Sequence, residues 1–526
     1  MKKTGKLLCL VIALAMLAPA AMAEGSYWTG EEDGITLTYW VGLSANAATQ
    51  LNSYAESPVY KTVMEASGLN LEFIHPATGE ESTAFNLMLV SGELPDIIEY
   101  SWNSYEGGPQ KAIDDGVILP LNDLLETYAP DAYAMMTRTD SLYRQCTTDD
   151  GTFYAFIPIA NSTSIPNGMT VDSVQSGPII RADWLEELGL EVPQTIDDWT
   201  NVLTAFKEQK GAQAPLTFSG ITANFLPFSG AFDASTDYYL DEGVVKYGPM
   251  EEEYRAFLQQ MKDWYDAGLL DPDFASNDSA TQTSNLLNGV SGAFTGAYIG
   301  GVASINQSGQ ALDPAFRYVG APYPVTQEGQ TPRMGQYAFE ARTSGQAAIT
   351  TACEHPEIAA RFLNYYYTQE GGLLKNFGVE GEGYYRDEEG NVYNSELLTN
   401  NPDGLTLKQA QAVYSRGDGA SPGPVIKVYD ISEEANEAVA LWYTIAPNVL
   451  ETVYPSAATY TSDEAAEISM LTPNINAYRE EMFVKFIMGT ADLETEWDGY
   501  VEYLKTLGVE RALEIRQAAV DRYNER

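Results

Sequence analysis

The sequence predicts an α/β protein, and the order of elements near the amino terminus is the main reason. Residues 35–39, 71–74 and 96–100 read as short strands, and helical patterns at 58–66 and 84–90 separate them. A β-α-β-α-β order of this kind is typical of a parallel sheet with helices on its faces. The chain has 526 residues, which is too many for one ordinary hydrophobic core. Two or more domains are therefore expected.

Clear stop signals bound these first elements. Gly68 follows the first helical pattern and Gly92 follows the second. Glycine is favoured just past a helix end because it adopts the left-handed conformation without a side-chain clash. Pro95 cannot continue a helix, so the largely apolar run 96–100 is predicted to be a buried strand. That strand leads to Trp102 at its carboxyl end, the edge where open α/β sheets bind ligands.

A second α/β region begins with a strand at 179–180. The helix predicted at 183–188 ends at Gly189, and Thr195 with Asp198 forms a capping-box pattern for the next helix. Further amphipathic helices follow, and the carboxyl-terminal part is mostly helical. The order of these elements indicates that the chain leaves its first region and later returns to it, so contiguous domains are not expected.

Residues 1–23 read as a secretory signal. Three lysines precede an apolar run at 7–17, and an Ala-Met-Ala site ends the segment. We predict cleavage near Ala23, a flexible lead-in at 24–34 and an extracytoplasmic location. No later apolar run in the sequence is long enough to cross a bilayer as a helix.

The chain is strongly acidic. Its formal net charge is −45, and loss of the three signal lysines would bring this to −48. Such a chain repels nucleic acid and anionic membrane surfaces, so neither is expected as a partner. Two cysteines remain after the signal, Cys146 and Cys353. They could form one disulfide in an oxidising compartment or remain as buried free thiols, and the sequence leaves both open.

Enzyme signatures are absent from the sequence. The two histidines, His75 and His355, have no partner at metal-ligand spacing, and Ala293 breaks the one near match to a nucleophile elbow. Acidic turns at 271–273 and 387–391 are candidate Ca²⁺ ligands but lack EF-hand spacing, so solvated turns are favoured. We therefore predict no cofactor and no metal. Carboxylates are so numerous that a secreted carbohydrate-active enzyme stays open as an alternative.

Aromatic residues at the ends of the first strands are the candidate binding residues. Trp40 and Trp102 each directly follow a predicted strand of one β-α-β unit, so both should lie at one edge of one sheet. Asn103 and Tyr105 come close behind Trp102. A flat aromatic face suits a sugar ring, while neighbouring amides bond its hydroxyls. We predict that Trp102→Ala abolishes binding with little loss of fold.

Three later aromatics complete the candidate set. Tyr298 lies among small residues in a Gly-Ala-Tyr-Ile-Gly-Gly stretch, which would leave one ring face open. Tyr337 and Trp442 are weaker candidates, and Trp442 follows an amphipathic helix. Core packing is the alternative for every candidate in this set. The remaining tryptophans on amphipathic helices are assigned to the core: Trp184, Trp199, Trp264 and Trp497.

The order of motifs resembles the extracellular solute-binding proteins of ABC importers, family 1, of the oligosaccharide-binding type. Each motif alone is modest, but together they run in family order over nearly the whole mature chain. The matching stretches are SGELPDII (91–98), GVILPLNDLLETYAP (116–130), DGTFYAFIP (150–158), IIRADWLEELGLEVPQTIDDW (179–199), MKDWYDAGLLDPDF (261–274), HPEIAARFLNYYYTQEGG (355–372), GVEGEGYY (378–385) and a tail at 485–523.

The resemblance implies two α/β lobes, each a sheet flanked by helices, joined by crossing strands at a hinge. It implies a first lobe of residues 35–155 and 320–378 and a second lobe of residues 156–319 and 379–526. The turn at 150–158 and the stretch 318–324 match the two main crossings of the family.

The resemblance also implies a function. A carbohydrate would be held between the lobes, with Tyr298 under a sugar ring, and delivered to the permease subunits of an ABC importer without catalysis. A monomer is expected. Many relatives carry a lipid-anchored cysteine directly after the signal, but here Glu24 follows Ala23, so no lipobox cysteine is predicted. A peptide or another polar solute as the ligand stays open.

Overall fold

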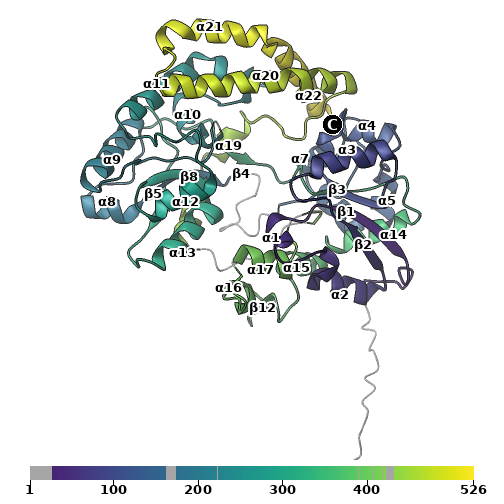
Figure 1. Cartoon of the computed structure of the whole chain (residues 1–526). Coiled ribbons are helices and arrows are strands. Elements are labelled where there is room, and N and C mark those ends of the chain that lie inside the picture. The colour runs from purple at the N-terminus through teal and green to yellow at the C-terminus, as the bar shows by residue number, and fades with distance from the viewer. Residues whose placement is uncertain are drawn as a thin grey trace, which may run out of the picture.

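The structure is a computed structural model that describes residues 27–160, 173–221, 223–388, 390–405, 407–417, 419–421 and 432–526. These residues form two lobes, each with its own sheet and surrounding helices (Figure 1). The segments predicted as signal and most of the lead-in lie outside the described residues. No helix among the described residues is long and apolar enough to span a membrane.

The first lobe contains a four-stranded sheet in the order β11-β3-β1-β2. Strand β1 pairs in parallel with β2 and β3, which confirms the predicted β-α-β-α-β unit, while β11 pairs antiparallel to β3. Because β1 and β3 are parallel neighbours, their carboxyl ends lie at the same edge of the sheet. The strands are β1 (Thr36–Val41), β2 (Asn70–Ile74), β3 (Ile97–Tyr100) and β11 (Gln346–Ile349).

Helices cover both faces of this sheet. The predicted helix stops are confirmed, because Gly68 and Gly92 adopt left-handed φ values of 75° and 71° at the ends of α2 and α3. The helices are α1 (Ala45–Ala48), α2 (Pro58–Ser67), α3 (Glu81–Ser91), α4 (Gly108–Asp114), α5 (Asn122–Tyr128), α6 (Pro130–Met136), α7 (Asp140–Cys146), α14 (Pro356–Tyr365), α15 (Gln369–Phe377), α16 (Glu396–Thr399) and α17 (Leu407–Tyr414). A small hairpin of β12 (Tyr384–Arg386) and β13 (Val392–Asn394) follows α15.

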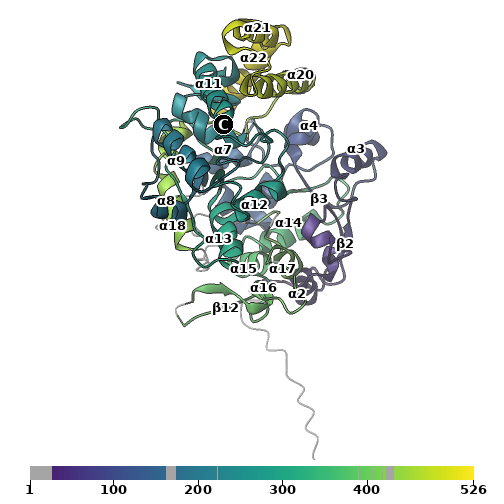
Figure 2. The same ribbon diagram turned by 60° about the vertical axis from the view of Figure 1, so that its left-hand side comes forward.

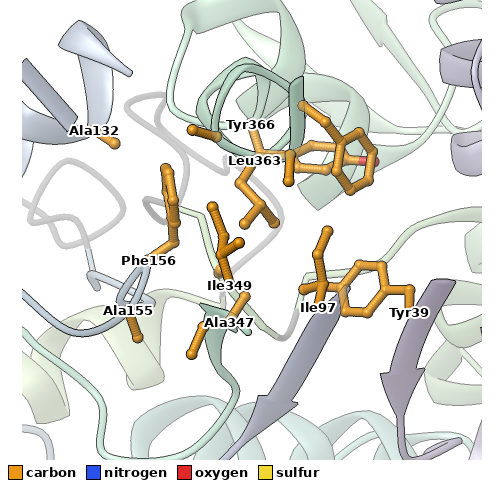
Figure 3. Packing of buried hydrophobic residues seen from close by; sticks show 14 of the residues in the cluster. Tyr39, Ile97, Ala132, Ala155, Phe156, Ala347, Ile349, Leu363 and Tyr366 are labelled. Atoms are coloured by element: carbon orange, nitrogen blue, oxygen red, sulfur yellow. The ribbon is translucent and has the colours of Figure 1, made fainter. Parts of the chain in front are cut away.

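The first core is assembled from segments that are far apart in sequence. Figure 3 shows Tyr39 and Ile97 from the strands beside Ile349 of β11 and Tyr366 at the end of α14. All four side chains are at most 1% exposed. Cys146 and Cys353 are also buried on this side, and both are free thiols, so the alternative of a disulfide between them is not what the structure shows.

The second lobe is built on a three-stranded antiparallel sheet in the order β8-β5-β9. A hairpin of β6 and β7 lies apart from it. The strands are β5 (Ser176–Arg181), β6 (Tyr238–Asp241), β7 (Val244–Tyr247), β8 (Ala293–Ala297) and β9 (Tyr318–Gly320).

Eleven helices of the described residues belong to this lobe, and the predicted capping box of Thr195 and Asp198 is present at the start of α9. They are α8 (Ala182–Leu188), α9 (Ile196–Gln209), α10 (Leu226–Ser229), α11 (Glu252–Asp266), α12 (Ser279–Leu287), α13 (Ser304–Gln310), α18 (Glu433–Tyr443), α19 (Ala446–Leu450), α20 (Ser462–Ile487), α21 (Leu493–Thr506) and α22 (Val509–Glu525).

Two segments cross between the lobes side by side. Phe156 and Ile159 bridge Ala347 and Ala341, and further along β4 (Ser173–Val174) pairs antiparallel with β10 (Tyr337–Ala338). The first predicted crossing, 150–158, thus leads into this ladder. The second prediction, 318–324, is wrong: Tyr318–Gly320 is strand β9 of the second lobe, and the stretch through β10 crosses instead.

The buried clusters also divide the chain differently from the predicted boundaries. Ala321, Tyr323 and Val325 are buried, and the first two belong to clusters of the second lobe, so 320–340 does not belong to the first. Conversely, Ala420 packs in the first core together with α17 residue Ala412. The boundaries differ because the chain returns to the first lobe only after β10. The segment that follows α15 still packs on the first lobe.

A joint at the end of α22 links the lobes a second time. In Figure 1 the helices α20 to α22 lie across one end of the molecule, and α22 ends beside α4 and α7 of the first lobe. Arg526 donates to Asp149 (Nη2–Oδ1 2.6 Å) and to the carbonyl of Thr147 (2.7 Å), and its side chain is 1% exposed. Arg522 also pairs with Asp149 (Nε–Oδ2 3.0 Å). We call Asp149, Arg522 and Arg526 the interlobe joint.

Candidate functional site

Aromatic side chains gather at the carboxyl edge of the first sheet, where the sequence placed them. Trp40 of β1 contacts Tyr100 of β3, with ring centroids 5.7 Å apart, and Phe85 of α3 lies 4.5 Å from Tyr100. Trp102 lies 5.6 Å from Phe85 and 6.4 Å from Tyr105. The prediction that both tryptophans share one edge is therefore confirmed, because β1 and β3 are parallel neighbours.

The structure favours the alternative of core packing for these two tryptophans. Trp40 is 4% exposed and Trp102 is 0% exposed, so both indoles are core residues in this structure. After β3 the chain turns into a short 3-10 helix, Trp102–Ser104, which packs the indole back against Phe85. The backbone N–H of Trp102 donates to Oε1 of Gln346 (3.0 Å) on β11 and fixes this turn. Trp102→Ala should therefore damage the fold, contrary to expectation.

Asn103 and Tyr105 lie at the rim of this edge and are half-buried. The amide Nδ2 of Asn103 donates to the carbonyl of Ser456 (3.4 Å) from the second lobe. The hydroxyl of Tyr105 donates to Oδ2 of Asp115 (2.9 Å), and burial together with this carboxylate raises the pKa of Tyr105 to about 12. Asn103 therefore contacts the second lobe, whereas the partners of Tyr105 belong to the first lobe.

The three candidates that follow in the sequence, Tyr298, Tyr337 and Trp442, differ in how far their side chains are buried. Trp442 is 1% exposed and its Nε1 donates to the carbonyl of Ala321 (2.8 Å). A β-carbon on Gly177 would lie 2.4 Å from that nitrogen, so the indole fills the notch left by glycine and is a core residue. The predicted open ring face of Tyr298 is wrong: the residue is 6% exposed, because it begins a π-helical turn packed on the same cluster. Tyr337 of β10 stays half-buried.

A polar cavity of about 280 Å³ opens on the first lobe, and we call it the first-lobe cavity. Residues directly after β1 form one wall: Ser44 caps α1 by accepting from the N–H of Ala47, and the hydroxyl of Tyr54 accepts from the N–H of Ser44 (3.3 Å). Helix α17 packs against α1 and forms the other wall. The lining residues are Ser44, Asn46, Tyr54, Asn376, Lys408, Gln411, Ala412, Ser415, Arg416 and Gly417.

A buried ion pair fixes the base of this cavity. Nη2 of Arg416 lies 2.7 Å from Oε1 of Glu99 on β3, and both side chains are 3% exposed. The hydroxyl of Tyr39 donates to the other oxygen of Glu99, and the Arg416 guanidinium lies 4.5 Å from the ring centroid of Tyr54. Burial first, and then the Glu99 charge, raise the pKa of Tyr39. This ion pair therefore joins Glu99 of the sheet to Arg416, which lies 317 residues later in the chain.

His75 supports the same wall in its neutral form. Its Nε2 accepts from the backbone N–H of Tyr54 (3.2 Å), so the proton lies on Nδ1, which donates to the carbonyl of Val41 (2.8 Å). Burial lowers the pKa of His75, and the Arg416 charge lowers it further against the Val41 hydrogen bond. His75 is therefore a positioning residue that the sequence did not single out.

A second cavity of about 190 Å³ lies on the second lobe, and we call it the second-lobe cavity. Burial, followed by the charge of Glu251, raises the pKa of its Tyr239 to about 12. Asp237 on the wall lies 3.3 Å from Nη1 of the buried Arg479 of α20. The lining residues are Leu226, Ser235, Thr236, Asp237, Tyr238, Tyr239, Met334, Gly335, Gln336, Val449, Thr452, Val453 and Tyr454.

The two cavities border the interlobe region from opposite sides. In Figure 1, α1 and α17 lie on the side of the first lobe that faces the second, and α19, which lines the second-lobe cavity, lies on the side that faces the first. In the turned view of Figure 2, α15 and α17 lie beside each other, below α12 and α13 of the second lobe. Sequence reasoning missed these linings because they combine side chains from segments hundreds of residues apart.

No metal centre is evident in the described part of the chain: no three His, Cys, Asp or Glu side chains are grouped to hold one. Asp387 of the predicted acidic turn accepts locally from the N–H of Asn391 (2.8 Å). Asp271 differs from the expected solvated turn, because it is 3% exposed and accepts from Thr217 (2.7 Å) and Asn277 (2.8 Å). Asp271 is thus a buried hydrogen-bond centre of the second lobe.

Residues 48–373 match the family described as bacterial extracellular solute-binding proteins. The chain belongs to this family. It is similar to the fructooligosaccharide ABC transporter substrate-binding protein FusA of Streptococcus pneumoniae, with 24% identity over 83% of this chain and 82% of the relative. It is also similar to the polygalacturonan/rhamnogalacturonan-binding protein YtcQ of Bacillus subtilis, with 22% identity over 88% of this chain and 90% of the relative.

Solved structures share the two-lobed fold over nearly the whole chain. An HMO-binding, ABC-transporter-associated solute-binding protein of Bifidobacterium longum infantis superposes with a TM-score of 0.77 at 17% identity, covering 93% of this chain and 99% of that one. FusA of S. pneumoniae in complex with kestose gives a TM-score of 0.74 at 19% identity, with the same coverage. These likenesses establish the periplasmic-binding-protein-like fold.

Proposed function

We propose that this protein captures an oligosaccharide between its lobes and delivers it to the permease of an ABC importer. The observation that carries the proposal is the pair of cavities, one on each lobe, that border the interlobe region. Two relatives of the same family, FusA and YtcQ, are named for binding oligo- or polysaccharides. The proposal includes no catalytic step for this chain.

The chemistry of both linings suits a carbohydrate. Amides such as Asn46 and Gln411 and hydroxyls such as Ser235 can donate and accept, as sugar hydroxyls require. Tyrosine rings supply apolar faces for the C–H side of a sugar. Each cavity alone is smaller than the roughly 300–1,000 Å³ of most small-molecule pockets. A ligand held by both lobes must reach from one cavity to the other, which favours an oligosaccharide over a single sugar unit.

The rim residues Asn103, Tyr105 and Tyr337 are proposed to contact the ligand. Each is half-buried, and Asn103 already contacts the second lobe. The buried Trp40, Trp102 and Trp442 are proposed to act indirectly, by fixing the walls from behind. A ligand that contacts both lobes stabilises their closed arrangement, since it binds that state more tightly than the open one. The permease would then recognise the closed state.

A thermal-shift panel with product analysis tests this proposal. Purified mature protein is mixed with neutral and acidic oligosaccharides and with di- to tetrapeptides. We expect a raised unfolding midpoint with at least one oligosaccharide and an unchanged sugar on chromatography. Asn46→Ala should weaken binding, whereas Asn86→Ala, on the exposed face of α3, should not. A shift with peptides alone, or cleavage of the sugar, would contradict the proposal.

A further inference from the structure

We propose that the first-lobe cavity is the subsite for an acidic sugar unit, whose carboxylate is bound by Lys408. This inference rests on the proposed function and adds the substrate class. It follows from the distribution of charge between the two cavities. The chain carries 74 acidic and 29 basic Lys and Arg residues, so a wall that contains only cations is unusual for it.

The lining of the first-lobe cavity contains two cations and no carboxylate. Lys408 and Arg416 are its charged residues, and the remaining lining side chains are hydroxyls, amides and one alanine methyl, with Gly417. In contrast, the second-lobe cavity carries Asp237 on its wall and no lining cation. Asp237 is paired with Arg479 (Nη1–Oδ2 3.3 Å), which does not line that cavity, so a carboxylate there would meet no lining cation, whereas one in the first-lobe cavity would meet Lys408.

The two cations have different roles. Arg416 is 4% exposed and paired with Glu99, so its charge is compensated and its position is fixed. Lys408 is exposed on α17, and within the described residues no ion pair involves it. The ammonium of Lys408 therefore supplies the net positive charge of the cavity. Its flexible stem lets it meet a carboxylate as a point charge.

Neutral donors surround the position where a carboxylate would lie. Side-chain amides of Asn46 and Gln411 and the hydroxyls of Ser44 and Ser415 line the same wall. A carboxylate accepts several hydrogen bonds, and those from charged donors are about twice as strong as neutral ones. The cavity thus combines one strong cation contact with several weaker donors, which suits a sugar ring that carries one carboxylate.

The test compares an acidic oligosaccharide with its own neutral form. Affinities are measured by calorimetry for trigalacturonate, for its methyl ester, which has the same ring without the charge, and for sialyllactose, whose acid is terminal. The acid should bind roughly ten- to hundredfold more tightly than the ester, as expected for a charge-assisted contact. Preference for trigalacturonate indicates a uronate unit, and preference for sialyllactose indicates a sialic acid.

Variants assign the effect to the cavity. Lys408→Gln should remove most of the acid-over-ester preference, and Lys408→Arg should retain it. Lys61→Gln, on the exposed face of α2 in the same lobe, should behave as wild type. Because Lys408 is exposed, all three variants should keep the wild-type unfolding midpoint.

The outcomes separate this inference from the proposed function. If the protein binds neutral oligosaccharides and shows no preference for any acid over its neutral form, the acidic subsite is wrong and the proposed function stands. If the acid is preferred but Lys408→Gln leaves that preference unchanged, the assignment to the first-lobe cavity is wrong. If no oligosaccharide binds at all, the proposed function itself fails.

Discussion

The two lobes share a fold class, but different forces hold a key segment of each in place. In the first lobe, a buried ion pair between Glu99 and Arg416 ties a central strand to the segment beside the cavity. In the second lobe, shape fixes helix α18 instead: the indole of Trp442 fills the notch left by Gly177, and its Nε1 donates to the carbonyl of Ala321. Charge fixes one of these segments, and close packing fixes the other.

Because of this difference, the two lobes tolerate different kinds of substitution. A packed indole tolerates no change of volume, because protein interiors are nearly as dense as crystals. A buried ion pair tolerates no loss of one partner, because the other charge is then uncompensated. Substitutions in the two lobes should therefore fail in different ways, and the following predictions rank these failures.

The largest effect is expected for Trp442→Ala in the second lobe. Loss of the buried indole leaves a cavity and an unsatisfied carbonyl at Ala321, which should cost about 5 kcal/mol of stability. Calorimetric unfolding checks this value. Trp28→Ala, at a half-exposed ring, is the control and should cost far less. A near-neutral Trp442→Ala would contradict the packing role.

Trp102→Ala in the first lobe should cost about 4 kcal/mol, because a fully buried ring is removed. Tyr105→Ala, at the half-buried neighbouring ring, should spare the fold and weaken ligand binding. Unfolding midpoints and ligand affinities are measured for both. A stable Trp102→Ala protein that has lost all binding would instead support direct ligand contact by Trp102.

Arg416→Met should destabilise the first lobe by about 3 kcal/mol, because Glu99 is left buried without its cation. The double variant Glu99→Met with Arg416→Met should recover part of this loss. The recovery distinguishes charge from volume. If the double variant is as unstable as the sum of the single ones, charge does not hold this wall.

Asp149→Asn weakens the interlobe joint. Its contacts with Arg522 and Arg526 join the lobes, and the loss should amount to about 1 kcal/mol. The result should be a few-fold change in ligand affinity and a wider distribution of interlobe distances in solution scattering. Glu502→Gln, at an exposed ion pair within α21, is the matched control. Equal scattering profiles for both variants would exclude the joint as a restraint.

The smallest effect concerns pH. The pKa of His75 is lower in the folded protein than in the unfolded chain, so the unfolded chain binds more protons as pH falls below about 6.5. The contribution of neutral His75 to stability is therefore fully present above that pH and declines below it. The unfolding midpoint of His75→Gln should fall less than that of wild type between pH 7.5 and 5.5. A steeper fall in the variant would contradict this sign.

Much of the first lobe, and the start of α9 in the second, follows from local sequence signals. Strand and helix order near the amino terminus, the glycine stops at Gly68 and Gly92 and the capping box at Thr195 were all predicted and are present. These signals are local, because backbone conformation and cap hydrogen bonds depend on residues a few positions apart. The shared edge of Trp40 and Trp102 also followed, since parallel strands of one unit end together.

The sequence by itself therefore determined the α/β class, the first parallel unit and the absence of familiar enzyme motifs. Only the tertiary structure decided which aromatics are buried, where the chain crosses between lobes and which residues line the cavities. The physical reason is separation along the chain: Glu99 meets Arg416, and Asp149 meets Arg526, across more than 300 residues. No local sequence pattern indicates such pairs. The indole of Trp102 turns inward because it packs against Phe85, and Gln346 accepts a hydrogen bond from the backbone N–H of Trp102.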